Sequence, residues 1–190
     1  AMRILQNVST HCYLLESAQA NEAWGRYTFL GYDPKLEINC IDGHMKLGKL
    51  SVETENPSEY IRQILSEYKS PKFDYLPSFT GGLVGYFSYD YLGYKEKSIR
   101  GNARDTEDFK DVDLMLFDKV IAFDNLCQKI ILIANMSLDA PETGYNKAIV
   151  ELKQLRELLM HGEKKQNMGG KLLGEVTPLF EKEQYCEMVE

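Results

Sequence analysis

The segment from Pro77 to Tyr91 constrains the fold more than any other part of this chain. It has the pattern of an aromatic β-strand that is interrupted by three glycines, Gly81, Gly82 and Gly85. Glycine weakens a strand because it offers no side chain to packing and loses much conformational freedom on folding. Glycines at such places indicate a bulge, or a backbone or ligand that comes too close for a Cβ atom. The segment therefore predicts a strand at a crowded point of a sheet, with a bent edge strand in an ordinary core as the alternative.

The composition is that of an acidic globular protein with one domain, or with one domain and part of another. The chain has 190 residues, of which 44% are hydrophobic and 27% are charged, and its formal net charge is −7. A chain of this length buries roughly 70% of its unfolded surface, so its core needs neither a disulfide nor a metal. The negative charge argues against a nucleic-acid partner, because no surplus of basic residues exists to replace the counterions of the phosphates.

We expect a cytoplasmic protein without a membrane partner. No apolar run approaches the roughly 20 residues that span a bilayer, and no signal peptide is visible. The four cysteines are scattered without a Cys-x-x-Cys pair and the three histidines lack metal-ligand spacing, which favours reduced core thiols and no metal site in this chain. The acidic run from Asp105 to Asp113 lacks the ligand pattern of a calcium loop, so we interpret it as solvated.

Hydrophobic alternation predicts antiparallel strands beside the glycine-rich one. They are expected over residues 12–17, 26–32, 36–40, 45–47, 114–123 and 129–134. Asp42-Gly43 and Asp124-Asn125 have the composition of hairpin turns. A short helical or looped piece is expected from Tyr89 to Tyr94. Repeated hairpins imply antiparallel sheets.

Helical periodicity predicts helices that cover these sheets. The first begins at Asn56-Pro57, where a side-chain cap precedes a proline, and it ends at Pro71. Its expected buried stripe is Tyr60, Ile61, Ile64, Leu65 and Tyr68. The second opens at Pro141 and is capped by Gly162. Its expected buried stripe is Tyr145, Ala148, Ile149, Leu152, Leu155 and Leu159. A further helix begins at Thr177. The predicted fold class is α+β, with layered antiparallel β sheets and covering helices.

Three blocks of sequence resemble the amino-terminal domain of anthranilate synthase component I, in the family of chorismate-utilising enzymes. The blocks are Leu14 to Ser17 (LLES) with Gly25 to Gly31 (GRYTFLG), then Phe79 to Tyr91, then Asp113 to Asp124 (DLMLFDKVIAFD). Their order and spacing match the family, and the resemblance is strong over residues 13–135. It implies the smaller lobe of that fold, truncated at both ends. Residues 2–162 are then the regulatory domain, 163–176 a linker and 177–190 the truncated start of the chorismate-binding catalytic domain.

The resemblance also implies where the chemistry is performed. The parent enzyme converts chorismate and ammonia or glutamine into anthranilate and pyruvate in tryptophan biosynthesis. It is a lyase that requires Mg²⁺ and takes ammonia from a glutamine amidotransferase subunit. Its catalytic, chorismate-binding and magnesium-binding residues are in the larger lobe. Consistent with this, the chain has no nucleophile elbow, zinc-protease motif or phosphate loop. We therefore expect no catalytic residues in this chain, and no activity from it alone.

The smaller lobe of this family carries a feedback-inhibition pocket for tryptophan, and the resemblance implies that Leu15, Glu16 and Ser17 form part of it. Glu16 suits the ligand ammonium, Ser17 and its neighbouring amide suit the carboxylate, and Leu15 suits a wall for the indole. Arg26, one hairpin away, is the fourth candidate, as a pocket-lining cation. The plain structural alternatives are a solvent-facing Glu16, a turn at Ser17 and a surface ion pair for Arg26. Trp24 is interpreted as core or loop packing rather than as part of a site.

Other functions stay open at this point. The same lobe occurs in aminodeoxychorismate synthase, on the folate route, and isochorismate and salicylate synthases are more distant options. A stand-alone binding domain is an alternative of a different class. In the favoured interpretation, inhibition by tryptophan requires coupling between the lobes, and the glycine-rich strand is the candidate transmitter because its missing side chains would let the other lobe approach.

Overall fold

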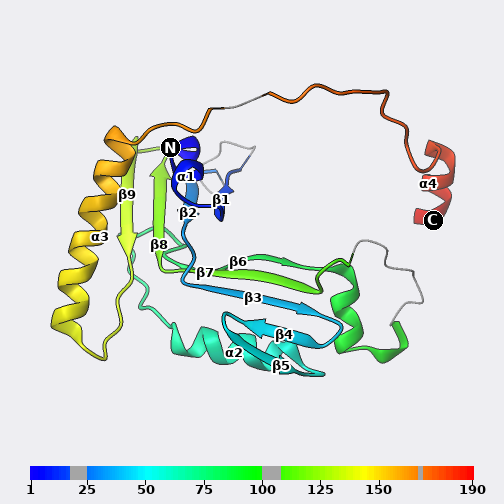
Figure 1. Cartoon of the computed structure of the whole chain (residues 1–190), viewed down its shortest axis with the longest axis horizontal. Helices are drawn as coiled ribbons and strands as arrows, with labels where there is room; N and C mark the ends of the chain where they lie inside the picture. The colour runs from blue at the N-terminus through cyan, green and yellow to red at the C-terminus, as the bar shows by residue number, and fades with distance from the viewer. Residues whose placement is uncertain (18–24, 100–107, 167–168) are drawn as a thin grey trace.

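The computed structural model describes residues 1–17, 25–99, 108–166 and 169–190, and within them the chain forms two antiparallel sheets (Figure 1). Sheet A has the strand order β1-β2-β8-β9 and sheet B the order β5-β4-β3-β7-β6. The strands of sheet A are β1 (Cys12–Leu15), β2 (Tyr27–Tyr32), β8 (Lys119–Asp124) and β9 (Lys129–Ala134). Those of sheet B are β3 (Leu36–Ile41), β4 (His44–Leu47), β5 (Leu50–Glu53), β6 (Gly82–Phe87) and β7 (Val112–Phe117).

Three of the four helices cover the sheets, as the predicted α+β class requires, and the fourth is exposed throughout. They are α1 (Met2–Val8), α2 (Pro57–Glu67), α3 (Pro141–His161) and α4 (Lys182–Val189), with short 3₁₀ turns at Tyr89–Tyr94 and Lys97–Ile99. Helices α1 and α3 pack on sheet A around Leu5, Leu30, Ile121 and Leu155. Helix α2 packs on sheet B, where Ile61 and Ile64 meet the inner residues of β3, β4 and β7. The fold class expected from the sequence is thereby confirmed.

The chain crosses between the two sheets twice. One crossing divides a segment that was predicted as a single strand into two strands, one in each sheet. A single strand was expected over residues 114–123, but the chain bends at Asp118, so β7 belongs to sheet B and β8 to sheet A. The other crossing is at Asp33, whose φ of +52° lies in the left-handed region. Lys119 lies 3.2 Å from the Asp33 carboxylate and Lys35 lies 3.7 Å from that of Asp118. Each crossing thus supplies a cation to the carboxylate of the other.

Two of the three glycines lie where the sequence indicated crowding: Gly81, directly before β6, and Gly85 within it, whereas a Cβ atom at Gly82 would come no nearer than 3.8 Å to Phe79. A Cβ atom at Gly85 would lie 1.9 Å from the carbonyl oxygen of Asp113 on β7. At Gly81 it would lie 2.7 Å from the amide nitrogen of Asn135 and 3.0 Å from the carbonyl oxygen of Phe117. The prediction of a close backbone approach is therefore confirmed at Gly85. The atoms that need the space belong to this same domain, however, so the idea that the space admits another lobe was wrong at these positions.

Several helix details differ from the prediction. Asn56 precedes α2, but its side chain bonds Ser58 and Glu59 rather than capping a backbone amide. The two expected stripes are only partly buried: Leu65 on α2, Tyr68 directly after α2 and Tyr145 on α3 are exposed. Helix α3 does end at Gly162, although that glycine is extended rather than left-handed. A Cβ there would meet the Leu158 carbonyl and Ile4 at 2.4 and 2.6 Å.

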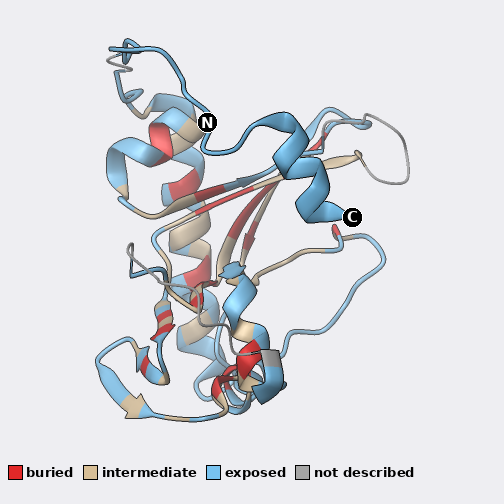
Figure 2. Cartoon of the chain, turned by 90° about the vertical axis from the view of Figure 1, so that its right-hand side faces the viewer, coloured by how far each residue is buried: buried red, intermediate tan, exposed pale blue. Residues whose placement is uncertain are grey.

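The carboxyl-terminal segment contributes nothing to the core of the described chain. Helix α4 starts at Lys182 rather than at Thr177, because a capping box between Glu181 and Gln184 sets its first turn. Figure 2 shows α4 and the chain that leads to it as exposed, and none of the described residues from Gly162 onward is buried.

Helix α1 and strand β5 were not predicted. Among the described residues, no helix has the length and apolar character needed to cross a bilayer.

All four cysteines are free, as expected, although they are not all core thiols. Cys40 is buried and Cys12 is half-buried, whereas Cys127 and Cys186 are exposed. The part of the acidic run that precedes Asp108, and the side chain of Trp24, lie outside the described residues.

Candidate functional site

The LLES block lies at the end of strand β1, at the open edge of sheet A. The last paired residue of the strand is Leu15, which lies opposite Phe29 of β2. Glu16 and Ser17 follow directly and are exposed, and Leu15 itself is 44% exposed. Strand β1 is thus shorter than the predicted strand over 12–17: Leu15 is still paired in the sheet, and Glu16 and Ser17 lie beyond its end.

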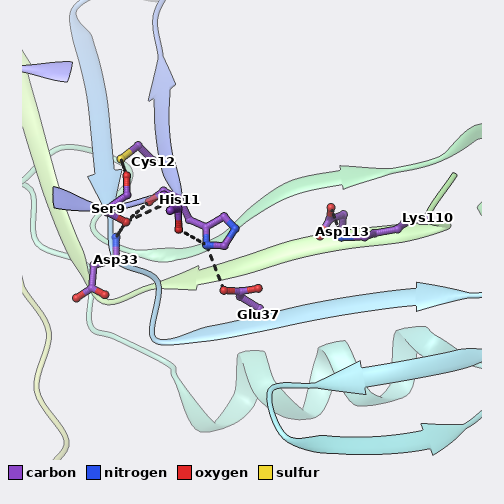
Figure 3. A network of polar contacts seen from close by, with 8 residues as sticks. Ser9, His11, Cys12, Asp33, Glu37, Lys110 and Asp113 are labelled. Atoms are coloured by element: carbon purple, nitrogen blue, oxygen red, sulfur yellow. Dashed lines mark hydrogen bonds and ion pairs between the residues drawn. The ribbon is translucent and has the colours of Figure 1, made fainter. Parts of the chain in front are cut away.

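A polar network fixes the opposite end of β1 (Figure 3). The Ser9 hydroxyl accepts a hydrogen bond from the backbone N–H of Asp33 at 3.1 Å and donates to the carbonyl oxygen of His11 at 2.9 Å. The His11 ring nitrogen Nδ1 lies 3.2 Å from Glu37 on β3. These contacts tie the start of β1 to the crossing from β2 to β3, and so to both sheets. The position of Leu15 at the other end follows from this anchor.

An apolar pocket of about 440 Å³ begins beside Leu15. It is formed where the end of β1, helix α2 and strand β6 meet. Its lining side chains or backbone come from Leu15, Ile61, Leu65, Phe79, Leu83, Val84, Gly85, Phe87 and Leu114. Its volume is within the roughly 300–1,000 Å³ that is usual for small-molecule sites. An apolar ring fits this chemistry, and the polar residues Glu16 and Ser17 follow Leu15 in the chain.

An aromatic layer supports the pocket from behind. The rings of Phe79 and Phe29 meet edge to face with centroids 5.6 Å apart, and Tyr13 packs in the same way on Phe117 at 4.7 Å. One part of this layer was predictable from the sequence, since strand alternation places Tyr13 and Leu15 on one face. The partners Phe79 and Phe117 were not predictable, since they join the layer only through the tertiary fold.

Arg26 turns away from the other three candidates. It immediately precedes β2, and its guanidinium binds the carboxylate of Asp124 on β8, with the closest contact at 2.7 Å. Strand β8 lies on the side of β2 opposite to β1. The side chain of Asp124 is 4% exposed. Its pKa is held well below the usual range, first by the Arg26 hydrogen bonds and then by the backbone N–H of Cys127, while the pairing raises the pKa of Arg26.

The candidate residues therefore divide into two groups. Leu15 lines the pocket, and Glu16 and Ser17, which follow it directly in the chain, are exposed and are not among the lining residues. Arg26 instead forms an ion pair with Asp124, which was the structural alternative to a role in the pocket. Ile61 and Phe79 were not candidates from the sequence, although both line the pocket. Within the described ranges, no group of three or more histidine, cysteine or acidic side chains is arranged to hold a metal.

Comparison with known proteins shows which family this chain belongs to. The sequence profile of chorismate binding enzymes matches residues 10–190. The chain belongs to the chorismate binding enzyme family. The family resemblance inferred from the three sequence blocks is thus confirmed. Relatives that match this chain are named anthranilate synthase component 1, as the resemblance implied.

Anthranilate synthase component 1 of Pseudomonas aeruginosa is 36% identical to this chorismate binding family member over 155 residues, which are 77% of this chain and 31% of the relative. The Saccharomyces cerevisiae protein of the same name is 34% identical over 139 residues, or 72% and 26%. A crystal structure of anthranilate synthase component I from Streptococcus pneumoniae TIGR4 matches with a TM-score of 0.61 at 23% identity, over 77% of this chain and 32% of that one. The structural match supports the fold. The chain spans between about a quarter and a third of the length of these relatives.

Proposed function

We propose that this chain is the amino-terminal regulatory part of an anthranilate synthase component I, the lyase that forms anthranilate and pyruvate from chorismate and ammonia or glutamine. The observation that carries the proposal is the apolar pocket that begins at Leu15, directly before Glu16 and Ser17. Relatives named anthranilate synthase component 1, at 36% and 34% identity, supply the family context. The proposal includes a cytoplasmic location and a role in tryptophan biosynthesis.

The proposed ligand of the pocket is tryptophan, acting as feedback inhibitor. A free amino acid is a zwitterion, so its ammonium needs an acceptor and its carboxylate needs donors. The exposed Glu16 carboxylate serves the ammonium, and the Ser17 hydroxyl with its neighbouring amide serves the carboxylate. Leu15 and the apolar lining of the pocket take the indole. Because Asp124 holds its guanidinium, Arg26 acts in this proposal mainly by fixing the start of β2 beside the site.

The proposal assigns catalysis to polypeptide other than this chain. Residues 2–162 form the regulatory domain, 163–176 the linker and 177–190 the start of the catalytic domain. The exposure of the described residues after Gly162 supports this division, because they add nothing to the core. Chorismate and Mg²⁺ bind in the catalytic domain, and a glutamine amidotransferase subunit supplies ammonia. No nucleic acid or membrane takes part.

Inhibition at a distance requires that the ligand favours one of two arrangements of the lobes, by roughly 1–3 kcal/mol. Strand β6 is the proposed transmitter. Leu83, Gly85 and Phe87 of this strand line the pocket, so a ligand there contacts β6 directly. The strand is also the outer strand of sheet B, which leaves its other side available to the second lobe.

The testing experiment compares the full-length enzyme with the 190-residue chain. Given chorismate, ammonia and Mg²⁺, the full-length enzyme is expected to produce fluorescent anthranilate and to be inhibited by tryptophan, and the chain alone to produce none. Anthranilate formed by the purified chain would contradict the assignment of catalysis. Aminodeoxychorismate as the product would indicate the folate-route enzyme instead. A full-length protein without either activity would favour a stand-alone binding domain.

A further inference from the structure

The hydroxyl of Tyr13 is buried without a hydrogen-bond partner in the described part of the chain. Tyr13 is 8% exposed, and its oxygen is the one buried side-chain oxygen or nitrogen among the described residues with no partner. Burying a hydroxyl without a partner costs free energy, whereas a phenylalanine of the same shape would avoid that cost. A tyrosine at this position therefore suggests a partner that is bound only part of the time, such as a ligand.

A glycine on the neighbouring strand leaves space for the Tyr13 ring. Tyr13 on β1 lies opposite Gly31 on β2, and a Cβ atom at Gly31 would lie only 2.1 Å from Cε1 of the Tyr13 ring. Any larger residue at Gly31 would displace the tyrosine. The ring is then held edge to face by Phe117 at 4.7 Å and Phe79 at 6.3 Å. The hydroxyl is thus kept among apolar groups by three neighbours from three different segments.

Tyr13 lies one layer behind the proposed tryptophan pocket. Strand alternation puts its side chain on the same face of β1 as Leu15, and Leu15 lines the pocket. Phe79 both lines the pocket and contacts the Tyr13 ring. Tyr13 does not line the pocket itself, so Phe79 is the residue that connects its ring to the pocket. Desolvation raises the pKa of Tyr13, so the group stays a neutral hydroxyl that can accept or donate a hydrogen bond.

We propose that Tyr13 determines specificity at this site, with its hydroxyl accepting a hydrogen bond from the indole N–H of the bound amino acid. The inference rests on the proposed function and adds the group that distinguishes an indole from other apolar rings. A ring with an N–H supplies the partner that this hydroxyl lacks among the described residues of the free protein, a gain that a purely apolar site cannot offer. An amino acid whose ring lacks the N–H leaves Tyr13 as it is in the free protein.

The test is a thermodynamic cycle on the full-length enzyme. Wild type and Tyr13→Phe are each titrated calorimetrically with tryptophan and with its analogue in which sulfur replaces the indole N–H, β-(benzothiophen-3-yl)alanine. Wild type is expected to prefer tryptophan by roughly tenfold, the size of one net hydrogen bond. Tyr13→Phe is expected to reduce this preference to about twofold or less. Tyr27→Phe, which removes a hydroxyl from the neighbouring strand, is the matched control and should keep the wild-type preference.

The possible outcomes separate the two proposals. A tryptophan preference that is the same in wild type and Tyr13→Phe would overturn the role of Tyr13 while leaving the tryptophan site intact. Absence of tryptophan binding to wild type would overturn the site itself, and with it the role of Tyr13. A second measurement needs no variant: 1-methyltryptophan, which has no N–H, should bind wild type at least roughly tenfold more weakly than tryptophan. Equal binding of tryptophan and both analogues to wild type would also refute the inference.

Discussion

The side-chain amide of Asn135 donates a hydrogen bond to the carbonyl oxygen of Thr80 at 2.7 Å, joining the segment after β9 in sheet A to the segment before β6 in sheet B. The same amide nitrogen donates to the carbonyl oxygen of Asp118 at 3.0 Å, where the chain crosses between the sheets. The Asn135 side-chain oxygen accepts from the Ser70 hydroxyl at 3.1 Å. One side chain thereby fixes the start of β6, and β6 forms a wall of the candidate pocket.

Replacing Asn135 should loosen this junction. We expect Asn135→Ala to lower the free energy of unfolding by about 2 kcal/mol, because two carbonyl oxygens lose a donor. Urea denaturation measures the effect. The matched control is Asn146→Ala on the exposed face of α3, which should change stability by less than about 0.5 kcal/mol. Equal stability of the two variants would show that the junction does not depend on this amide.

Substitution of Gly85 should separate β6 from β7. The Cβ atom of Gly85→Ala would overlap the Asp113 carbonyl oxygen, and a backbone atom in a sheet cannot move aside cheaply. We expect a loss of about 3 kcal/mol or more in the free energy of unfolding. Gly170→Ala is the control, since no atom lies within 4 Å of the added Cβ. An alanine at position 85 that is tolerated as well as one at position 170 would contradict the close approach.

The Arg26–Asp124 pair should make stability depend on acid pH. Because the folded-state pKa of Asp124 is lowered, its contribution is complete above the unfolded value of roughly 4 and is lost as the pH falls below it towards the folded value. Wild type should therefore exceed Asp124→Asn in stability at pH 7, and the difference should shrink progressively below about pH 4. Denaturation series of both proteins across this range measure it. A difference that stays constant with pH would mean that the charge of Asp124 is irrelevant.

The proposed inhibitor site gives a prediction for Ser17. In the full-length enzyme, Ser17→Arg should crowd the pocket margin and raise the tryptophan concentration for half-inhibition by roughly tenfold or more, a loss of about 1.4 kcal/mol in binding. Turnover without tryptophan should change by less than about twofold, because catalysis is assigned to the other lobe. Ser51→Arg, on the exposed edge strand β5, controls for the added charge. An inhibition curve that Ser17→Arg does not shift would exclude Ser17 from the site.

Removal of residues 171–190 tests the proposed domain division. None of the described residues of this segment is buried, so the shortened chain should melt within about 2 °C of the 190-residue chain, a shift that corresponds to less than about 1 kcal/mol. Calorimetry on both chains makes the comparison. A fall of several degrees would show that the segment packs on the folded domain in solution.

The elements that local patterns define were predictable. The Asp42-Gly43 turn, the paired strands around it and the helix that opens at Pro141 follow from short-range chemistry that any chain with these residues shares. The three resemblance blocks gave the family, and the first of them gave Leu15, Glu16 and Ser17 as neighbours in space. Residues that are adjacent in the chain remain adjacent in the fold, although the strand itself ends at Leu15.

The contacts that decide the site were not predictable in the same way. Arg26 and Asp124 are 98 positions apart, and alternation continues through Asp118 although the chain changes sheets there. No local pattern encodes such relationships, because they depend on which strands become adjacent.

The amino-acid sequence by itself determined the α+β class, the crowded glycine strand and the family. Only the tertiary structure decided that the end of β1, helix α2 and strand β6 line one open apolar pocket, and that Arg26 pairs with Asp124 instead of lining it. The physical reason is that periodicity and turn chemistry act over a few residues. Burial and ion pairing instead depend on distances that are set when remote segments pack together.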